Sequence, residues 1–77
     1  MSQTNNTAKA HAYILVEVWD REITNKQFSS FEEAQNELKK TFSSIIDDNN
    51  SNEYELGDNW AWCNGDYAYD AKIISVA

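Results

Sequence analysis

The chain has 77 residues, which allows one small domain and excludes a two-domain enzyme. Its 13 acidic residues against 6 basic ones give a formal net charge of −7. So few Lys and Arg argue against direct binding of nucleic acid, whose phosphates need such partners. A hydrophobic content of 42% excludes an intrinsically disordered chain.

The first part of the chain predicts a tail followed by a strand. Residues 1–10 are polar and aperiodic, so we expect a mobile tail there and a single domain over residues 11–77. Residues 12–19 are rich in β-branched and aromatic side chains, which favour a strand. Alternation gives this strand two largely apolar faces, as in a central strand: one carries Ile14, Val16 and Val18, the other Tyr13, Leu15, Glu17 and Trp19. We expect a turn over residues 20–22 and a short polar edge strand over residues 23–28.

The most regular pattern predicts an amphipathic helix. Ser30 and Glu33 have the spacing of a capping box, in which the serine hydroxyl accepts a hydrogen bond from the N–H of the glutamate. Apolar residues follow at helical spacing and form one stripe: Phe31, Ala34, Leu38, Phe42 and Ile45. We expect the helix to end near Ile46 or Asp47, because residues 47–52 are poor helix formers.

The last third of the chain predicts a β-hairpin around Asn64-Gly65. This dipeptide favours a two-residue type I′ turn, since both residues tolerate positive φ. With Cys63 opposite Asp66, one face would carry an aromatic ladder: Trp60, Trp62, Tyr67 and Tyr69. The opposite face would place small or aliphatic residues against the helix: Ala61, Ala68, Ile74 and Val76.

Together these elements predict the α+β class, with a small antiparallel sheet in the order β-β-α-β-β and one helix packed on one face. A domain of this size has a thin core, and the sequence offers it neither an internal disulfide nor an obvious metal site. Its stability would therefore depend on dense aromatic packing or on a partner subunit.

Residues able to carry catalysis are scarce. The one histidine, His11, lies beside the predicted tail, so a Ser-His-Asp or Cys-His arrangement would depend on a loosely held base. Cys63 has no basic neighbour in sequence, and the two glycines suit turns better than a phosphate-binding loop. The sequence thus predicts no enzyme activity, no catalytic residue and no cofactor. The single thiol fits a reducing cytosol and no run is apolar enough to span a membrane, so we expect a cytoplasmic location.

The segment from Asp47 to Asp58 has part of the spacing of a calcium-binding loop. Oxygen-bearing side chains occupy the ligand positions of such a loop: Asp47, Asn49, Ser51, Glu53, Glu55 and Asp58. The sixth position, however, is Asn52 instead of the glycine that the sharp turn requires, and no second helix is expected to follow. The sequence therefore favours a solvated loop without metal.

Negative charge is concentrated in the second half of the chain. Residues 41–77 hold one basic residue, Lys72, and seven acidic ones: Asp47, Asp48, Glu53, Glu55, Asp58, Asp66 and Asp70. Two interpretations are open. The carboxylates either solubilise the domain or form a patch that docks on a basic surface of a partner protein, such as one that otherwise holds nucleic acid.

The predicted aromatic ladder has two interpretations as well. Trp and Tyr dominate binding hot spots, so an exposed ladder would be a protein interface. Alternatively the rings close a second small core beneath a neighbouring segment. A base-stacking role is disfavoured, because the flanking residues are acidic.

The stretches 12–38 (AYILVEVWDREITNKQFSSFEEAQNEL) and 58–76 resemble small uncharacterised acidic proteins of Gram-positive bacteria and of their phages and mobile elements. That set is similar in size and acidity to anti-CRISPR and other anti-defence inhibitors, and it has no diagnostic motif. The resemblance implies a compact binder that blocks a host enzyme acting on nucleic acid.

Two functional hypotheses follow. The first is a non-enzymatic inhibitor or adaptor that binds a protein with a basic surface and contacts neither nucleic acid nor a membrane. Its expected binding residues are acidic and aromatic: Asp47, Asp48, Glu53, Glu55, Asp58, Trp60, Trp62, Asp66, Tyr67, Tyr69 and Asp70. The second hypothesis is a homodimeric structural or regulatory domain that pairs through its aromatic sheet face.

Overall fold

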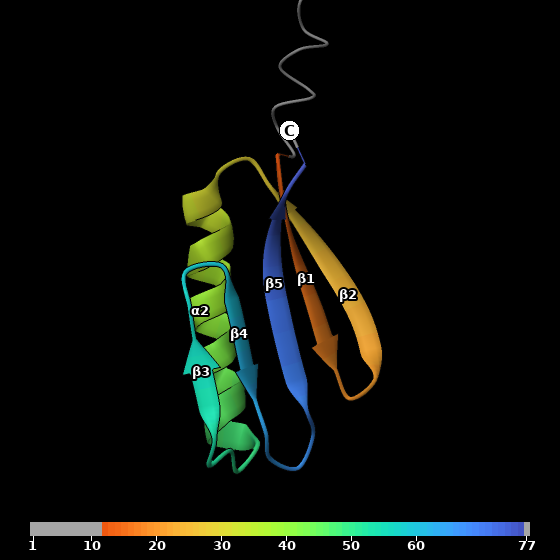
Figure 1. Ribbon diagram of the computed structural model, residues 1–77, viewed down its shortest axis with the longest axis vertical. Helices are drawn as coiled ribbons and strands as arrows, with labels where there is room; N and C mark the ends of the chain where they lie inside the picture. The colour runs from red at the N-terminus through yellow and green to blue at the C-terminus, as the bar shows by residue number, and fades with distance from the viewer. Residues whose placement is uncertain (1–11, 77) are drawn as a thin grey trace, which may run out of the picture.

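The computed structural model describes residues 12–76; the predicted tail over residues 1–10 and His11 lie outside this range. One helix packs on one face of a five-stranded antiparallel sheet in the described residues, which confirms the predicted α+β class (Figure 1). The elements in sequence order are β1 (Tyr13–Trp19), β2 (Glu22–Phe28), α2 (Phe31–Asp48), β3 (Tyr54–Leu56), β4 (Trp60–Cys63) and β5 (Tyr69–Ser75). The short strand β3 is an addition to the predicted order.

The sheet has the spatial order β2-β1-β5-β4-β3. β1 pairs antiparallel with both β2 and β5, which agrees with the interior position predicted from its two apolar faces. A two-residue turn, Asp20-Arg21, joins β1 to β2, and both residues have a positive φ (52° and 68°) as in a type I′ turn. The polar edge strand predicted over residues 23–28 is present but begins one residue earlier, at Glu22, so the turn predicted over residues 20–22 is two residues long.

The helix α2 begins as the capping pattern predicts. Ser30 is its N-cap, and the hydroxyl of this residue accepts a hydrogen bond from the N–H of Glu33 at 3.1 Å. The Glu33 carboxylate accepts in turn from the hydroxyl of Ser29 at 2.7 Å, which lowers the pKa of Glu33. The helix ends at Asp48, where the N–H of Asn49 donates to the carbonyl of Ile45.

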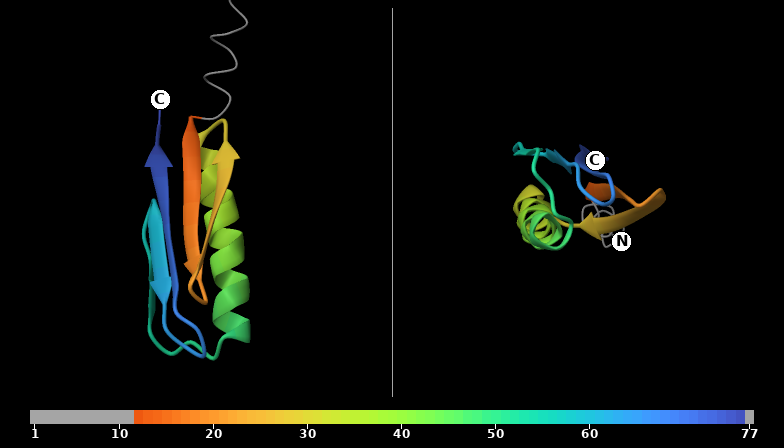
Figure 2. Two further views of the ribbon diagram at one scale, coloured as in Figure 1. Left: turned by 90° about the vertical axis from the view of Figure 1, so that its right-hand side faces the viewer. Right: turned by 90° about the horizontal axis from the view of Figure 1, so that it is seen from below.

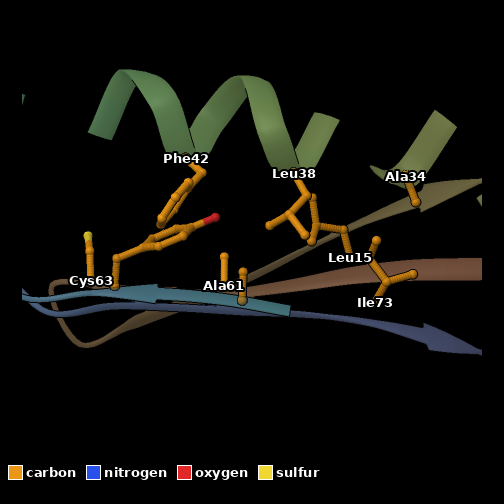
Figure 3. Close-up of a cluster of buried hydrophobic side chains, with 9 residues drawn as sticks. Leu15, Ala34, Leu38, Phe42, Ala61, Cys63 and Ile73 are labelled. Carbon is orange, nitrogen blue, oxygen red and sulfur yellow. The ribbon is translucent and has the colours of Figure 1, made fainter. Parts of the chain in front are cut away.

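The core lies between α2 and the sheet face that the helix covers (Figure 3). The predicted stripe supplies its helical side, with Ala34, Leu38 and Phe42 buried. The buried residues of the sheet face them: Leu15, Ala61, Cys63, Tyr69, Ala71 and Ile73. Seen along the molecule, α2 lies on one side of the sheet, and the described residues place no element over the other side (Figure 2).

The register of the last hairpin differs from the prediction. β4 and β5 pair with Cys63 opposite Tyr69, three residues beyond the predicted partner Asp66. Residues 64–68 therefore form a loop instead of a two-residue turn. Of the Asn64-Gly65 dipeptide only Gly65 has a positive φ, at 134°, so the predicted type I′ turn is wrong at this position.

An odd shift of register moves the side chains of one strand to the other face of the sheet. Tyr69 consequently lies beneath α2 with 1% of its surface exposed, while Trp60 and Trp62 lie on the opposite face. Tyr67 belongs to the loop and packs edge-on against Trp19 with ring centroids 5.8 Å apart. The predicted four-residue aromatic ladder is therefore wrong.

The same shift corrects the residues expected against the helix. Ala61 does lie in the core, but Ile74 and Val76 are 44% and 52% exposed. Ala68 is an exposed residue of the loop that precedes β5.

Candidate functional site

The sheet face away from α2, here called the open face, carries large apolar side chains. Its register follows from the pairing of three neighbouring strands, β1, β5 and β4. One row across these strands consists of Val18, Asp70 and Trp62, and the next consists of Val16, Lys72 and Trp60. A third row pairs Ile14 with Ile74.

A groove of about 380 Å³ lies on the open face. Its apolar wall includes Val16, Val18, Trp60 and Ile74, and Trp60 is 39% exposed. Asp70 and Lys72 line the same groove, so one carboxylate and one ammonium group stand among apolar neighbours. Such a surface can bury apolar side chains of a partner and orient that partner through two fixed charges.

Glu55 adds a second carboxylate at the β3 edge of the open face. It lies opposite Trp62 in the β3–β4 pairing, and its Oε1 accepts a hydrogen bond from the indole Nε1 of Trp62 at 3.0 Å. This contact fixes the indole of Trp62 beside a negative charge. It also uses the one hydrogen-bond donor of that side chain.

Carboxylates gather at one end of the molecule, here called the acidic end. The C-terminus of α2, the β1–β2 turn and the β4–β5 loop all lie there (Figure 1). Exposed acidic residues come to this end from four separate segments: Asp20, Asp47, Asp48, Glu53 and Asp66. The β1–β2 turn also places one exposed basic residue there, Arg21. Asp20 was not among the predicted binding residues, since the sequence places it in the less acidic half.

The acidic end is electrostatically unfavourable for the helix. Asp47 and Asp48 lie in the last turn of α2, which has no basic residue, and the C-terminus of a helix carries the negative end of its dipole. These two carboxylates therefore do not stabilise the helix. A positively charged surface nearby would relieve the repulsion.

Asn49 holds the β4–β5 loop against the end of α2. It is 2% exposed, and its Nδ2 donates to the carbonyls of Tyr67 at 2.7 Å and Asn64 at 3.0 Å. Its backbone carbonyl accepts from the N–H of Asp66 at 2.9 Å. The sequence suggested a solvated position for Asn49, whereas its side chain is a buried anchor that positions Asp66 in the acidic end.

A second pocket, of about 260 Å³, lies between α2 and the β1–β2 side of the sheet. It is here called the Glu17 pocket, and its walls include Glu17, Trp19, Thr24, Thr41, Ile45 and Tyr69. Glu17 is only 5% exposed, and its Oε2 accepts a hydrogen bond from the hydroxyl of Tyr69 at 2.7 Å. Burial, followed by this bond to Glu17, raises the pKa of Tyr69 above its ordinary range.

Lys26 bridges two carboxylates beside that pocket. Its Nζ lies 2.8 Å from Oε2 of Glu37 and 3.7 Å from Oε1 of Glu17. The hydrogen bond to Glu37 raises the pKa of Lys26, and the same contact lowers the pKa of Glu37. Lys26 is thus bound more closely to Glu37 than to Glu17.

The predicted binding residues divide into separate groups in the structure. Glu55, Trp60, Trp62 and Asp70 belong to the open face, and Asp47, Asp48, Glu53 and Asp66 belong to the acidic end. The remaining three belong to neither group of binding residues. Tyr69 is in the core, Tyr67 packs against Trp19 in the β4–β5 loop, and Asp58 lies near Gln35, which donates to its carbonyl at 2.9 Å.

The aliphatic residues of the open face were not predicted as binding residues. The sequence did indicate Val16 and Val18, because residues 12–19 have a second apolar face that the predicted helix does not cover. The sequence also indicated Ile74, because Asp70, Lys72 and Ile74 are spaced two residues apart along β5 and therefore lie on the same exposed face.

Residues with reactive or metal-binding side chains form no further site in residues 12–76. Cys63 is buried, and no group of three or more His, Cys, Asp or Glu side chains in the described range is arranged to hold a metal ion. The helix of this range is also not apolar enough to cross a membrane.

Comparison with protein-family models, with curated proteins and with solved structures gave no match.

Proposed function

We propose that the chain is a non-enzymatic protein-binding module that engages a partner protein through its open face. The observation that carries this proposal is the groove lined by Val16, Val18, Trp60 and Ile74, which no other element of the described residues covers. Burial of these apolar side chains, which come from three neighbouring strands, would contribute about 25 cal/mol for each Å² removed from water. A partner surface is the source of that burial in this proposal.

The charges around the groove indicate the chemistry of the partner. The chain carries a net charge of −7, and Asp70 and Glu55 place carboxylates on or beside the open face. The acidic end adds the carboxylate of Asp66 in the β4–β5 loop. It also adds those of Asp47 and Asp48 in the last turn of α2, on the other side of the sheet. A partner with an apolar centre and basic residues around it would be complementary to this arrangement.

In its more specific form, the proposal makes the chain an inhibitor of the kind encoded by phages and mobile elements, similar to anti-CRISPR proteins. It would act in the cytoplasm and occupy a basic groove in which a host enzyme otherwise holds nucleic acid. Small size and acidity support this form, because carboxylates compete with phosphates for Lys and Arg.

Site-specific photo-crosslinking tests the proposal. A photoreactive residue at Ile74 lies on the open face, and a matched control at Asn36 lies on the exposed side of α2. We expect the Ile74 position alone to capture a basic protein in the producing cell or its host. We then expect the affinity of the purified pair to fall with added salt and with the paired changes Asp47→Asn and Asp48→Asn. Equal capture from both positions, or affinity indifferent to salt and to these variants, would contradict the proposal.

A homodimer is the second candidate function, and the middle of the open face favours it. Asp70 and Lys72 lie two residues apart on β5 and point to the same side. If two copies stack face to face about a twofold axis between these residues, Asp70 of each copy meets Lys72 of the other. The surrounding Val and Trp side chains would then form a second core.

Charge exchange tests the homodimer. Sedimentation at micromolar concentration would report a dimer, which either single variant, Asp70→Lys or Lys72→Asp, should weaken through like-charge contacts. The double variant carries both changes and should restore the dimer. A monomer under these conditions contradicts the homodimer and leaves the basic partner as the candidate occupant.

A further inference from the structure

We propose that the Glu17 pocket binds a primary alkylammonium group, with the Glu17 carboxylate as its anion and the rings of Trp19 and Tyr69 among its walls. This site is separate from the open face, because Glu17, Trp19 and Tyr69 point to the helix side of the sheet. Its ligand could be a free small amine or the side chain of a lysine in another protein, since both present the same cation.

Glu17 is an acidic residue held among the core residues of the sheet. A carboxylate buried at 5% exposure among core residues is unfavourable unless its charge is compensated. Oε2 accepts from the hydroxyl of Tyr69 at 2.7 Å, and Nζ of Lys26 lies 3.7 Å from Oε1. Tyr69 and Lys26 thus compensate a carboxylate that lies in the wall of the pocket.

The other oxygen of this carboxylate, Oε1, forms an ion pair with Lys26 but no close hydrogen bond with it. Nζ of Lys26 lies 3.7 Å from Oε1, whereas it donates to Glu37 at 2.8 Å. Every fully buried side-chain oxygen and nitrogen in the described residues has a hydrogen-bond partner. Oε1, which has no such partner within hydrogen-bond distance, is therefore not fully buried, and Glu17 is one of the residues that line the pocket.

The walls of the pocket carry two carboxylates, Glu17 and Glu22, and no Lys, Arg or His. The ammonium group of Lys26, beside the pocket, is hydrogen-bonded to Glu37. The charge of the walls therefore favours a cation over an anion. Ile45 and the aromatic rings offer apolar contact to an alkyl chain, and aromatic faces attract cations. The hydroxyls of Thr24 and Thr41 are further acceptors for a group that carries three N–H donors.

Titration of the full chain with n-butylammonium chloride, followed by amide NMR, tests the proposal. We expect saturable shifts at the amides of Glu17, Thr24 and Thr41 and at the indole N–H of Trp19, with a Kd in the millimolar range. Sodium chloride at equal ionic strength and the uncharged analogue n-butanol are the solute controls, and neither should give these shifts.

Variants then connect the shifts to the pocket. Glu17→Gln, with the fold checked by its amide spectrum, should weaken binding at least tenfold, whereas Glu55→Gln on the open face should leave binding unchanged. If Glu17→Gln does not fold, Thr24→Val on the exposed edge strand should weaken binding several-fold. Shifts of equal size with n-butanol, shifts that do not saturate, or shifts unchanged in Glu17→Gln or Thr24→Val would overturn the proposal.

A second ligand distinguishes a lysine side chain from a free amine as the natural source of the cation. A short blocked peptide with a central lysine that binds more tightly than n-butylammonium indicates a protein side chain as the natural ligand. Equal or weaker binding of the peptide indicates a free amine. A peptide with norleucine in place of lysine should give no shifts at Glu17, and shifts from it would overturn the assignment of a cation.

Discussion

The side chain of Asn49 pairs with the backbone of Tyr67 in both directions. Its Nδ2 donates to the Tyr67 carbonyl at 2.7 Å, and its Oδ1 accepts from the Tyr67 N–H at 2.9 Å. The side-chain amide, at the end of α2, thereby satisfies both backbone hydrogen-bonding groups of Tyr67, as a paired strand would. This pair fixes where β5 starts and hence the register of β4 against β5.

Asn49→Ala should lower the free energy of unfolding by about 2–4 kcal/mol, since it leaves the N–H and the carbonyl of Tyr67 without this partner in a partly buried site. The carbonyl of Asn64 also loses a donor but keeps the hydroxyl of Ser51. Urea denaturation measures the change. The matched control Asn36→Ala removes the same amide from the exposed side of α2 and should change stability by less than about 0.5 kcal/mol. Equal effects of the two variants would contradict the anchoring role.

Gly65→Ala should destabilise the domain more than Gly57→Ala. A Cβ at Gly65 would collide with the backbone carbonyl and side chain of Asn49, and its φ of 134° is one that L residues rarely adopt. We expect a loss of about 1–3 kcal/mol. A Cβ at Gly57 would meet only the indole of Trp60, which is exposed enough to move. Thermal unfolding compares the two, and an equal or larger loss at Gly57 would show that the loop tolerates a side chain.

Tyr69→Phe should make the domain less sensitive to alkaline pH. Because the pKa of Tyr69 is raised in the folded state, the unfolded chain loses this proton first as the pH passes the ordinary value of 10.0. The contribution to stability is therefore present below that pH and is lost above it, at about 1.4 kcal/mol for each pH unit. Denaturation at a series of alkaline pH values gives the free energy of unfolding as a function of pH. In Tyr69→Phe this free energy should fall less steeply with pH, by the amount that corresponds to one proton. Tyr13→Phe is the control and should retain the full slope.

Glu37→Gln should reduce the loss of stability in acid. Lys26 lowers the pKa of Glu37, so this carboxylate stabilises the fold above its ordinary pKa of 4.5, and the contribution is lost as the pH falls through the folded-state pKa. Solvent screens the pair, because Lys26 is nearly half exposed, and we expect about 0.5 kcal/mol or less. Denaturation at about pH 7 and about pH 3 should show that the free energy of unfolding of Glu37→Gln differs from that of the parent chain only at the higher pH. A difference that persists in acid would assign the effect to packing instead of charge.

The helix and the first hairpin could be predicted because their signals are local. Ser30 and Glu33 set the start of α2 by a contact three residues apart, and the apolar stripe has one period throughout. The Asp20-Arg21 turn follows directly from the break in apolar residues after Trp19.

The register of β4 and β5 could not be predicted in the same way, because a distant residue fixes it. Asn49 comes from the end of the helix, and a buried asparagine in a run of polar residues gives no sign of its burial. A signal did exist within β5: Asp70 and Lys72 alternate with Tyr69, Ala71 and Ile73, so the charged pair marks the face away from the core. The register was instead predicted from the preference of Asn64-Gly65 for a two-residue turn, and that register places Tyr69 on the wrong face of the sheet.

The pairing of β1 with β5 determines when during synthesis the domain can fold. Tyr13 lies opposite Ser75, and the N–H of Val76 donates to the carbonyl of Ala12, so strands from the two extremes of the described chain are neighbours. β1, β2 and α2 leave the ribosome first, but the inner edge of β1 has no partner until β5 has been made. The nascent chain therefore keeps an unpaired edge of β1 until β5 is available, and we expect the domain to fold only after β5 emerges.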